Sequence, residues 1–370
     1  MKLLVLQEDL SKALNLASRF TNAKIQLPIL SNILLKTQDS KLNVSATNLE
    51  SSISLNIGAK IESGGDITVP ARVINDLVSN LNKGQLSLET DKEKLLIKNN
   101  GFESYISGLN SADFPSVPTK AGKGSVIFPE DKFLDALSKV LFAASSDDTR
   151  PVLTGILLIL DKESLVMVAT DGFRLSQKKI NLEKSLKDGI RVIIPKNFLS
   201  ELVRVVAGKD ISFSFNKDEN QVVFATSFCC LASRIIEGEF PDFEKIIPKA
   251  FKIKVKADKE ELLQAVKLAS VFARDSANVV KLLIGEGFIQ FSAESSKYGS
   301  QETKVDAKIE GEEVKGFLTA FNFRFLEDLL NSFEGDEVEI ELSEPNSPVS
   351  FINSKDSDFL HIIMPVRLQG

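Results

Sequence analysis

The feature of this sequence that most limits its fold is a pattern that occurs three times at nearly even spacing. A proline, a short apolar run and a small polar pair occupy residues 28–35, and the same order returns at residues 151–158. A looser third copy, without the proline, covers residues 278–284. A long fixed period indicates duplicated units, and units of this length are domains rather than turns of a solenoid. The sequence therefore predicts three similar domains in tandem.

Two amphipathic helices are predicted in each repeat. Apolar residues that recur at i, i+3, i+4 and i+7 lie on one face of a helix, and a globular domain buries that face. The first helix of each repeat carries this spacing at Leu10, Ala13, Leu14 and Ala17, at Phe133, Ala136, Leu137 and Val140, and at Leu262, Ala265, Val266 and Ala269. The second helix carries it at Ile74, Leu77, Val78 and Leu81, at Leu199, Leu202, Val203 and Val206, and at Leu326, Leu329, Leu330 and Phe333.

The remainder of each repeat has the pattern of short strands. Apolar and polar residues alternate in runs such as residues 86–89, 211–215 and 338–342, which is typical of half-buried strands. Linkers with prolines lie near residues 115–118 and 241–248. We therefore predict an α+β protein made of three tandem copies of a two-helix, antiparallel-sheet domain. The expected domain boundaries are 1–122, 123–249 and 250–370.

Composition places the chain among soluble proteins with more than one core. Its 370 residues exceed the ~250–300 that one hydrophobic core usually supports, and 43% apolar with 26% charged residues is ordinary for globular proteins. The net charge of −6 argues against a protein that coats nucleic acid. The apolar start is too short for a signal peptide, and no apolar run is long enough to span a membrane. The adjacent Cys229 and Cys230 fit a reducing compartment, so we expect a cytoplasmic protein without membrane contact.

Residues that could carry catalysis are few. His361 is the single histidine, which cannot build a metal site by itself, and motifs for nucleotide binding or a serine nucleophile do not occur in the sequence. Asp171 followed by Gly172 could supply a catalytic carboxylate, but this pair between apolar runs favours a hairpin turn. Cys229 could act as a nucleophile only beside a base that the sequence does not identify. We expect a protein that is not an enzyme and holds no metal or cofactor.

The C-terminal segment is unusual because residues 359–368 stay apolar almost to the end of the chain. Pro365 cannot donate to a sheet, so the segment should leave its strand there. Met364, Val366 and Leu368 would then lie on one side. A core strand and a partly exposed groove for an extended peptide are both compatible with this pattern.

Five segments, in their order and spacing, resemble the bacterial DNA sliding clamps, the β subunits of DNA polymerase III. They are Leu-Pro-Ile-Leu-Ser-Asn at 27–32, Val-Pro-Ala-Arg at 69–72, Ala-Thr-Asp-Gly-Phe-Arg-Leu at 169–175, Gly-Glu-Phe-Pro-Asp-Phe at 238–243 and Met-Pro-Val-Arg-Leu at 364–368. The resemblance extends over the whole chain.

The resemblance implies a processivity factor. Two copies would join head to tail as a homodimeric ring that encircles duplex DNA without sequence specificity and slides along it. A hydrophobic groove would tether the replicative DNA polymerase and other clamp-binding proteins through linear peptide motifs. A separate ATP-driven clamp loader would be needed, since this chain has no nucleotide motif. Retention by topology requires only weak phosphate contacts, so an acidic protein could remain on DNA.

Site residues are implied by position within the same resemblance. The peptide-binding groove would contain Leu153, Thr170, Gly172, Phe173, Arg174, Leu175, Pro241, Ile246, Asn322, Phe325, Met364, Pro365, Val366, Arg367 and Leu368. Of these, Leu153, Leu175, Ile246 and Val366 would hold apolar side chains of the partner, while Arg174 and Arg367 would flank the groove with donors. Residues facing the DNA would be Lys24, Arg72, Arg150 and Lys196. The dimer interface would bring Val271 and Phe272 of one copy against Tyr105 and Ile106 of the other.

Two other functions remain open from the residues alone. A three-domain scaffold could bind peptides without DNA, and an open monomer would favour it. A hydrolase could use Asp171 or Cys229, and loss of turnover in Asp171→Asn would favour it.

Overall fold

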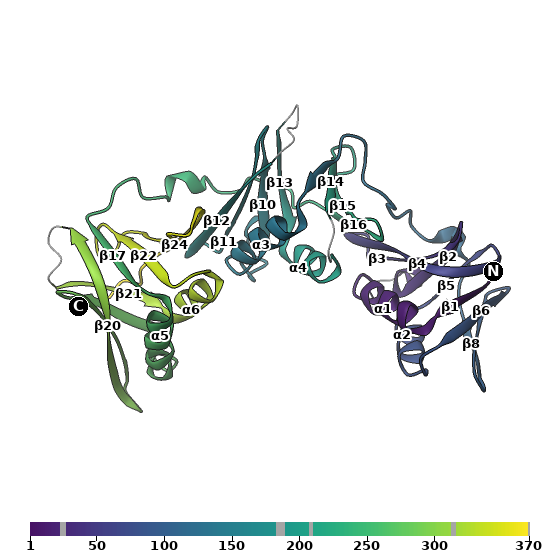
Figure 1. Ribbon diagram of the computed structural model, residues 1–370, viewed down its shortest axis with the longest axis horizontal. Helices are drawn as coiled ribbons and strands as arrows, with labels where there is room; N and C mark the ends of the chain where they lie inside the picture. The colour runs from purple at the N-terminus through teal and green to yellow at the C-terminus, as the bar shows by residue number, and fades with distance from the viewer. Residues whose placement is uncertain (23–26, 183–188, 207–209, 312–315, 369–370) are drawn as a thin grey trace. The chain divides into compact units, whose positions relative to one another are not determined.

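The computed structural model describes residues 1–22, 27–182, 189–206, 210–311 and 316–368. These residues form two compact units (Figure 1). Unit 1 contains Met1–Glu130 with Asn197–Ile235, and unit 2 contains Asp131–Lys196 with Ile236–Gly370. Each unit has one 12-stranded sheet, whose strand pairs are antiparallel.

The order of helices and strands repeats three times along the described residues. The first copy is β1 (Lys2–Leu6), α1 (Gln7–Ser18), β2 (Asn32–Gln38), β3 (Lys41–Thr47), β4 (Ser51–Ser63), β5 (Asp66–Pro70), α2 (Ala71–Ser79), β6 (Gln85–Asp91), β7 (Lys94–Asn99) and β8 (Phe102–Ser107). The second is β9 (Val126–Phe128), α3 (Glu130–Leu141), β10 (Gly155–Leu160), β11 (Ser164–Thr170), β12 (Arg174–Asn181), β13 (Ile190–Pro195), α4 (Lys196–Val205), β14 (Ile211–Asn216), β15 (Gln221–Ala225) and β16 (Cys229–Arg234). The third is β17 (Ile253–Asp258), α5 (Lys259–Ala273), β18 (Val279–Ile284), β19 (Phe288–Ser295), β20 (Gly299–Gly311), β21 (Phe317–Asn322), α6 (Phe323–Ser332), β22 (Glu337–Leu342), β23 (Val349–Asn353) and β24 (Asp356–Ile363). The predicted α+β class and threefold repeat are thereby confirmed.

Short 3-10 helices lie in the connections. They are η1 (Pro28–Ser31), η2 (Ser111–Asp113), η3 (Pro151–Leu153) and η4 (Phe243–Lys245). In η1 and η3 the proline of the repeated pattern is the first residue, where its fixed φ and missing N–H are tolerated.

One long strand in each unit joins strands of two repeats. In unit 1, β4 pairs with β1 through Ala59–Ser63 and with β16 of the second repeat through Ser51–Leu55. In unit 2, β12 pairs with β24 of the third repeat, from Arg174 opposite Ile363 to Lys178 opposite Phe359. The middle repeat therefore contributes β9, α4 and β14–β16 chiefly to unit 1, and α3 and β10–β13 to unit 2. The division into domains 1–122, 123–249 and 250–370 stays a prediction.

The helices bury the apolar faces that the sequence predicts. All twelve residues of the three first-helix stripes are buried. In the second helices the stripe extends past the last helical turn, because Leu81, Val206 and Phe333 follow the helix ends at Ser79, Val205 and Ser332. Val206 and Phe333 are nonetheless buried, so the chain still turns them into the core after the helix stops.

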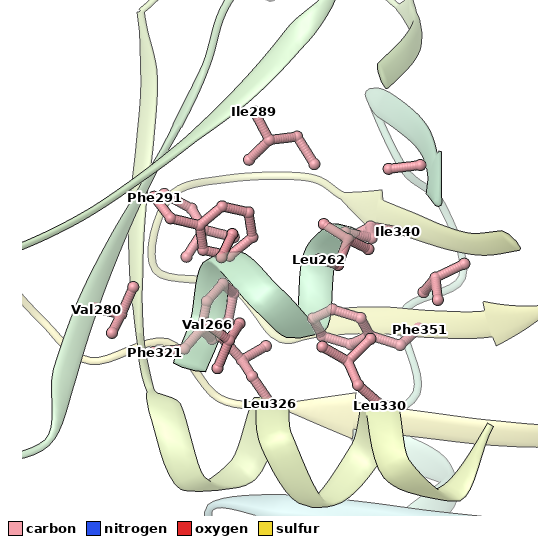
Figure 2. Packing of buried hydrophobic residues seen from close by; sticks show 14 of the residues in the cluster. Leu262, Val266, Val280, Ile289, Phe291, Phe321, Leu326, Leu330, Ile340 and Phe351 are labelled. Atoms are coloured by element: carbon pink, nitrogen blue, oxygen red, sulfur yellow. The ribbon is translucent and has the colours of Figure 1, made fainter. Parts of the chain in front are cut away.

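Figure 2 shows the core of the third repeat, where α5 and α6 pack on the sheet of unit 2. Leu262 and Val266 of α5 point toward Phe291, Phe321 and Phe351 of the strands. Fully burying side chains of this size contributes about 1.5–3 kcal/mol each. This core supports β21 and α6, which carry part of the site described below.

Truncating one of these side chains tests the contribution of the core. Leu262→Ala should lower the free energy of unfolding by about 2–5 kcal/mol, because Leu262 is 2% exposed and its removal leaves a cavity. Urea denaturation followed by circular dichroism measures the change. Gln264→Ala, at an exposed position of the same helix, should change the stability by about 0.5 kcal/mol or less. Equal effects of the two variants would contradict the assignment of the core.

Candidate functional site

The turn between β11 and β12 is built from Asp171, Gly172 and Phe173. Asp171 Oδ1 accepts hydrogen bonds from the backbone N–H groups of Phe173 at 2.9 Å and Arg174 at 3.0 Å. This arrangement is the side-chain turn that aspartate typically forms. Gly172 has a φ of 91°, a left-handed conformation that glycine adopts without steric cost. The hairpin turn predicted for Asp171 and Gly172 is therefore what forms here, and it leaves Phe173 60% exposed.

Arg174, at the end of this turn, is held by groups from three elements. Its Nε donates to Asp171 Oδ2 at 3.1 Å, its Nη1 to Asp328 Oδ2 of α6 at 2.6 Å, and its Nη2 to the carbonyl of Phe142 at 2.7 Å. The guanidinium also lies 4.5 Å from the centroid of the Phe325 ring and 5.4 Å from that of Phe142. Charge-assisted hydrogen bonds and cation–π contacts reinforce each other in such a setting.

The C-terminal segment passes between this turn and β21. The strand β24 ends at Ile363, so the segment leaves its strand before Pro365, as predicted. The backbone N–H of Met364 donates to the carbonyl of Phe173, and that of Val366 donates to the carbonyl of Ala320, both at 2.8 Å. These two bonds fix residues 364–366 against elements of two repeats.

Further predicted groove residues lie around the same turn. Leu175 and Ile246 belong to one hydrophobic cluster with Phe243 and Ile362, so the linker that contains η4 packs on the sheet. Thr170 donates its hydroxyl to the carbonyl of Arg174 at 2.6 Å. Asn322 caps α6 by accepting from the backbone N–H of Arg324. Pro241, Arg367 and Leu368 are exposed.

A cavity of about 380 Å³ opens beside the turn in unit 2. Its lining includes four predicted groove residues, Leu153, Phe173, Arg174 and Phe325, together with Arg150 and Lys196. The structure thus brings two of the residues predicted to face DNA to the same cavity as the predicted groove.

The four residues predicted to face DNA have different surroundings. Lys24 lies outside the described residues. Arg72 on α2 has a 93% exposed side chain, 3.7 Å from Asp76. Lys196 is half-buried and donates to the carbonyl of Ala144 at 3.0 Å. Burial, and then the nearby guanidinium of Arg174, lower the pKa of Lys196 below that of a free lysine.

The residues predicted at the dimer interface are also placed. Tyr105 on β8 and Val271 on α5 are each 59% exposed. Phe272 is half-buried and packs against the core of unit 2. Ile106 is only 5% exposed, because its side chain points into the core of unit 1.

The cysteines and the histidine considered for catalysis or metal binding are buried. Burial raises the pKa of the Cys229 thiol, and burial with the neighbouring Cys229 raises the pKa of Cys230 to about 12. Thiols in this state are poor nucleophiles. His361 is fully buried, with Nδ1 2.6 Å from the Ser176 hydroxyl, and burial holds its pKa well below the usual value. Within the described residues, no group of three histidine, cysteine, aspartate or glutamate side chains is arranged to hold a metal ion.

Two residues of the site were not identified from the sequence, Phe142 and Asp328. Phe142 directly follows α3 and Asp328 lies on α6, so both contact Arg174 from places far away in the chain. Comparison of the repeats could have identified Asp328, because an acidic residue occupies the same position in both helices. Asp328 is the sixth residue of α6, and Glu201 is the sixth residue of α4. Glu201 likewise pairs with an arginine of the preceding repeat, Arg19, at 3.3 Å.

Comparisons with known proteins agree along the whole chain. Family models of the DNA polymerase III beta subunit match in order: the N-terminal domain at residues 1–118, the central domain at 128–242 and the C-terminal domain at 244–367. The chain is 32% identical to the beta sliding clamp of Synechocystis sp. over 392 residues, covering 100% of both, and 28% identical to that of Staphylococcus aureus, covering 96% of both. The crystal structure of the DNA polymerase sliding clamp from Bacillus subtilis matches with a TM-score of 0.94 at 25% identity, and the DNA polymerase III subunit beta from Pseudomonas aeruginosa with 0.92 at 26%, each over 100% of both chains.

Gly172 offers a direct test of the turn. Gly172→Ala should lower the free energy of unfolding by about 1–2 kcal/mol, because a Cβ is disfavoured at this φ. The added Cβ would meet only Arg150 Nη1 at 3.5 Å, so the cost arises from the backbone and not from a clash. Thermal denaturation measures it. Gly58→Ala, where the Cβ meets nothing within 4 Å and φ is not left-handed, serves as the control and should not destabilise. A stable Gly172→Ala variant would show that the turn tolerates a side chain.

Proposed function

Because the chain belongs to the family of the DNA polymerase III beta subunit, the bacterial sliding clamps, we propose that it is the processivity factor of a replicative DNA polymerase. It acts as a closed ring that encircles duplex DNA and tethers the polymerase through a peptide-binding groove. The observation that carries this proposal is that all three family models match consecutive parts of the chain, in the order of the three structural repeats.

The ring requires a second copy of the chain, and unpaired strand edges in the single chain support pairing between two copies. The first two repeats each provide a long strand, β4 or β12, that pairs with the last strand of the next repeat. The corresponding strand of the third repeat, β20, pairs with β19 through Gly299–Asp306 and with β17 through Ala307–Gly311. Within the described residues, the edge of β20 opposite β19 has no partner strand at residues 299–303. The same is true of one edge of β8, which pairs only with β7 there. Exposed strand edges tend to pair, so β8 and β20 of two head-to-tail copies would complete each other.

Apolar side chains beside these edges support the same dimer. Val271 on α5 and Tyr105 on β8 are exposed in the single chain, and large exposed apolar side chains near a free edge are typical of an interface. Ile106 contributes to such an interface only indirectly, by holding β8 against the core of unit 1.

DNA binding in this proposal depends on topology more than on affinity. The net charge of −6 is unfavourable for tight phosphate binding, but a ring leaves DNA only by opening or at an end. Arg72, Arg150, Lys196 and Lys24 would provide weak contacts to the backbone. We propose that a separate ATP-driven clamp loader opens the ring and that the protein works in the cytoplasm. None of the described helices is long and apolar enough to cross a membrane.

The protein carries no catalytic activity in this proposal. Asp171 uses its carboxylate to hold two backbone N–H groups and Arg174 Nε, and raised pKa values keep the two cysteine thiols protonated at neutral pH. These placements weigh against the hydrolase alternative.

The groove can be tested with a labelled peptide. Met364→Ala combined with Val366→Ala should weaken binding of a fluorescein-labelled peptide with the polymerase's clamp-binding motif about a hundredfold, because two apolar walls are truncated. Fluorescence polarisation measures the affinity, and product length on primed circular DNA measures processivity. Phe251→Ala, which removes an exposed aromatic ring outside the predicted groove, is the control. Unchanged affinity in the double variant would mean that the groove lies elsewhere, and a wild-type chain that fails to lengthen products would contradict the proposed function.

The dimer can be tested at α5. Val271→Asp should shift the chain from dimer to monomer, because an unpaired charge would be buried between the copies. Val271 is exposed in the single chain, so the substitution should leave its folding intact. Light scattering after size-exclusion chromatography gives the mass, with Gln264→Asp at another exposed position of the helix as the control. A dimer that survives Val271→Asp at micromolar concentration would overturn this interface.

A further inference from the structure

Arg174 lies where two parts of the predicted groove meet, the 171–173 turn and the C-terminal segment. The carbonyl of Phe173, the residue before it, accepts the backbone N–H of Met364 at 2.8 Å. The carbonyl of Arg174 itself accepts the Thr170 hydroxyl at 2.6 Å. The position of the Arg174 backbone therefore determines where the turn meets the C-terminal segment.

The side chain of Arg174 is nearly buried, with 10% of its surface exposed. Three of its nitrogen atoms donate to acceptors of the protein, and the rings of Phe142 and Phe325 lie against it. A guanidinium in this environment needs its partners, because an unsatisfied buried donor is costly. The side chain is thus engaged within the protein rather than displayed to a ligand.

Asp328 is the acidic partner of Arg174 that comes from another repeat. Asp171 lies three residues before Arg174 and moves with the turn, whereas Asp328 projects from α6, which is anchored in the core by Leu326, Leu329 and Leu330. An ion pair to a rigid helix can hold a turn in one place, which an ion pair within the turn cannot do.

A related contact occurs in unit 1, although its arginine stands at a different position of the repeat. Glu201 occupies the same helical position as Asp328, and it pairs with Arg19, the residue that follows α1. In both units an acid on the second helix of one repeat binds an arginine of the preceding repeat. Only in unit 2 does that arginine belong to the turn of the predicted groove.

We propose that Asp328 is a positioning residue of the peptide-binding groove, which acts through Arg174 to hold the 171–173 turn against the C-terminal segment. This inference rests on the proposed function of the groove. Asp328 is half-exposed and lines the cavity beside the turn, and in this proposal it acts on the peptide through Arg174 rather than by direct contact. Removing the charge of Asp328 changes none of the predicted groove residues, but it allows the turn and Phe173 to move. The peptide must then order the turn when it binds, which lowers the affinity.

The test compares affinities of the full-length chain for the fluorescein-labelled peptide defined above. Asp328→Asn, which keeps the shape and removes the charge, should weaken binding about fivefold, the upper range for a half-exposed ion pair. Asp328→Glu restores the charge and should recover most of the affinity. Glu201→Gln, the matched substitution at the equivalent position of α4, should leave the affinity unchanged.

A double-mutant cycle separates positioning from general effects. In the background of Arg174→Met, Asp328→Asn should cause no further loss, because its effect passes through the guanidinium. A further fivefold loss in that background would overturn the proposal, since Asp328 would then act on the peptide or on overall stability. The chain has no tryptophan, so Phe173→Trp provides a single reporter, whose fluorescence anisotropy should fall when Asp328→Asn is added.

The outcomes distinguish this proposal from the function on which it rests. Equal affinities of wild type and Asp328→Asn for the peptide overturn the positioning role and leave the groove intact. A wild-type chain that does not bind the peptide overturns the proposed function, and this proposal with it.

Discussion

The structure depends on the backbone pairing of one strand in each of the first two repeats with the last strand of the next repeat. Ser51–Leu55 of β4 pairs with residues 229–233, and Arg174–Lys178 of β12 pairs with residues 359–363. Backbone N–H and C=O groups at such a seam must be paired when they are buried. This requirement merges the strands of neighbouring repeats into two 12-stranded sheets. It also places the C-terminal segment beside the β11–β12 turn, because β24 lies next to β12 and Met364 follows directly from it.

Local elements could be predicted from the sequence, whereas their partners could not. The spacing of Leu10, Ala13 and Leu14 identifies a buried helical face, because periodicity is a property of neighbouring residues. The pairing of Cys229 with Leu55 joins residues far apart in the chain, and no local pattern specifies it. For the same reason the repeat boundaries seen in the sequence differ from the borders of the compact units.

The sequence identified candidate positions for the site, whereas the contacts among these residues come only from the structure. The resemblance to a known family gave Arg174 and Phe325, but the ring stacks on the guanidinium because α6 brings it there. The equivalent place in unit 1 has the same backbone hydrogen bond but different side chains. There Arg234 donates to the carbonyl of Glu50, as Met364 does to that of Phe173. Glu50 and Arg234 are both charged, whereas Phe173 and Met364 are apolar, so at these two positions the second junction offers an extended peptide less apolar surface.

The interleaving of the two units along the chain has a consequence for its synthesis. Unit 1 needs Asn197–Ile235 to complete its sheet, so it cannot finish folding until those residues have left the ribosome. Residues 131–196 emerge earlier, yet their strand β12 must wait for β24 (Asp356–Ile363), which is translated much later. At about 5–20 residues per second that delay is roughly ten seconds or more. During this time the backbone edge of β12 that later pairs with β24 has no native partner, and this open edge can pair wrongly or be bound by a chaperone.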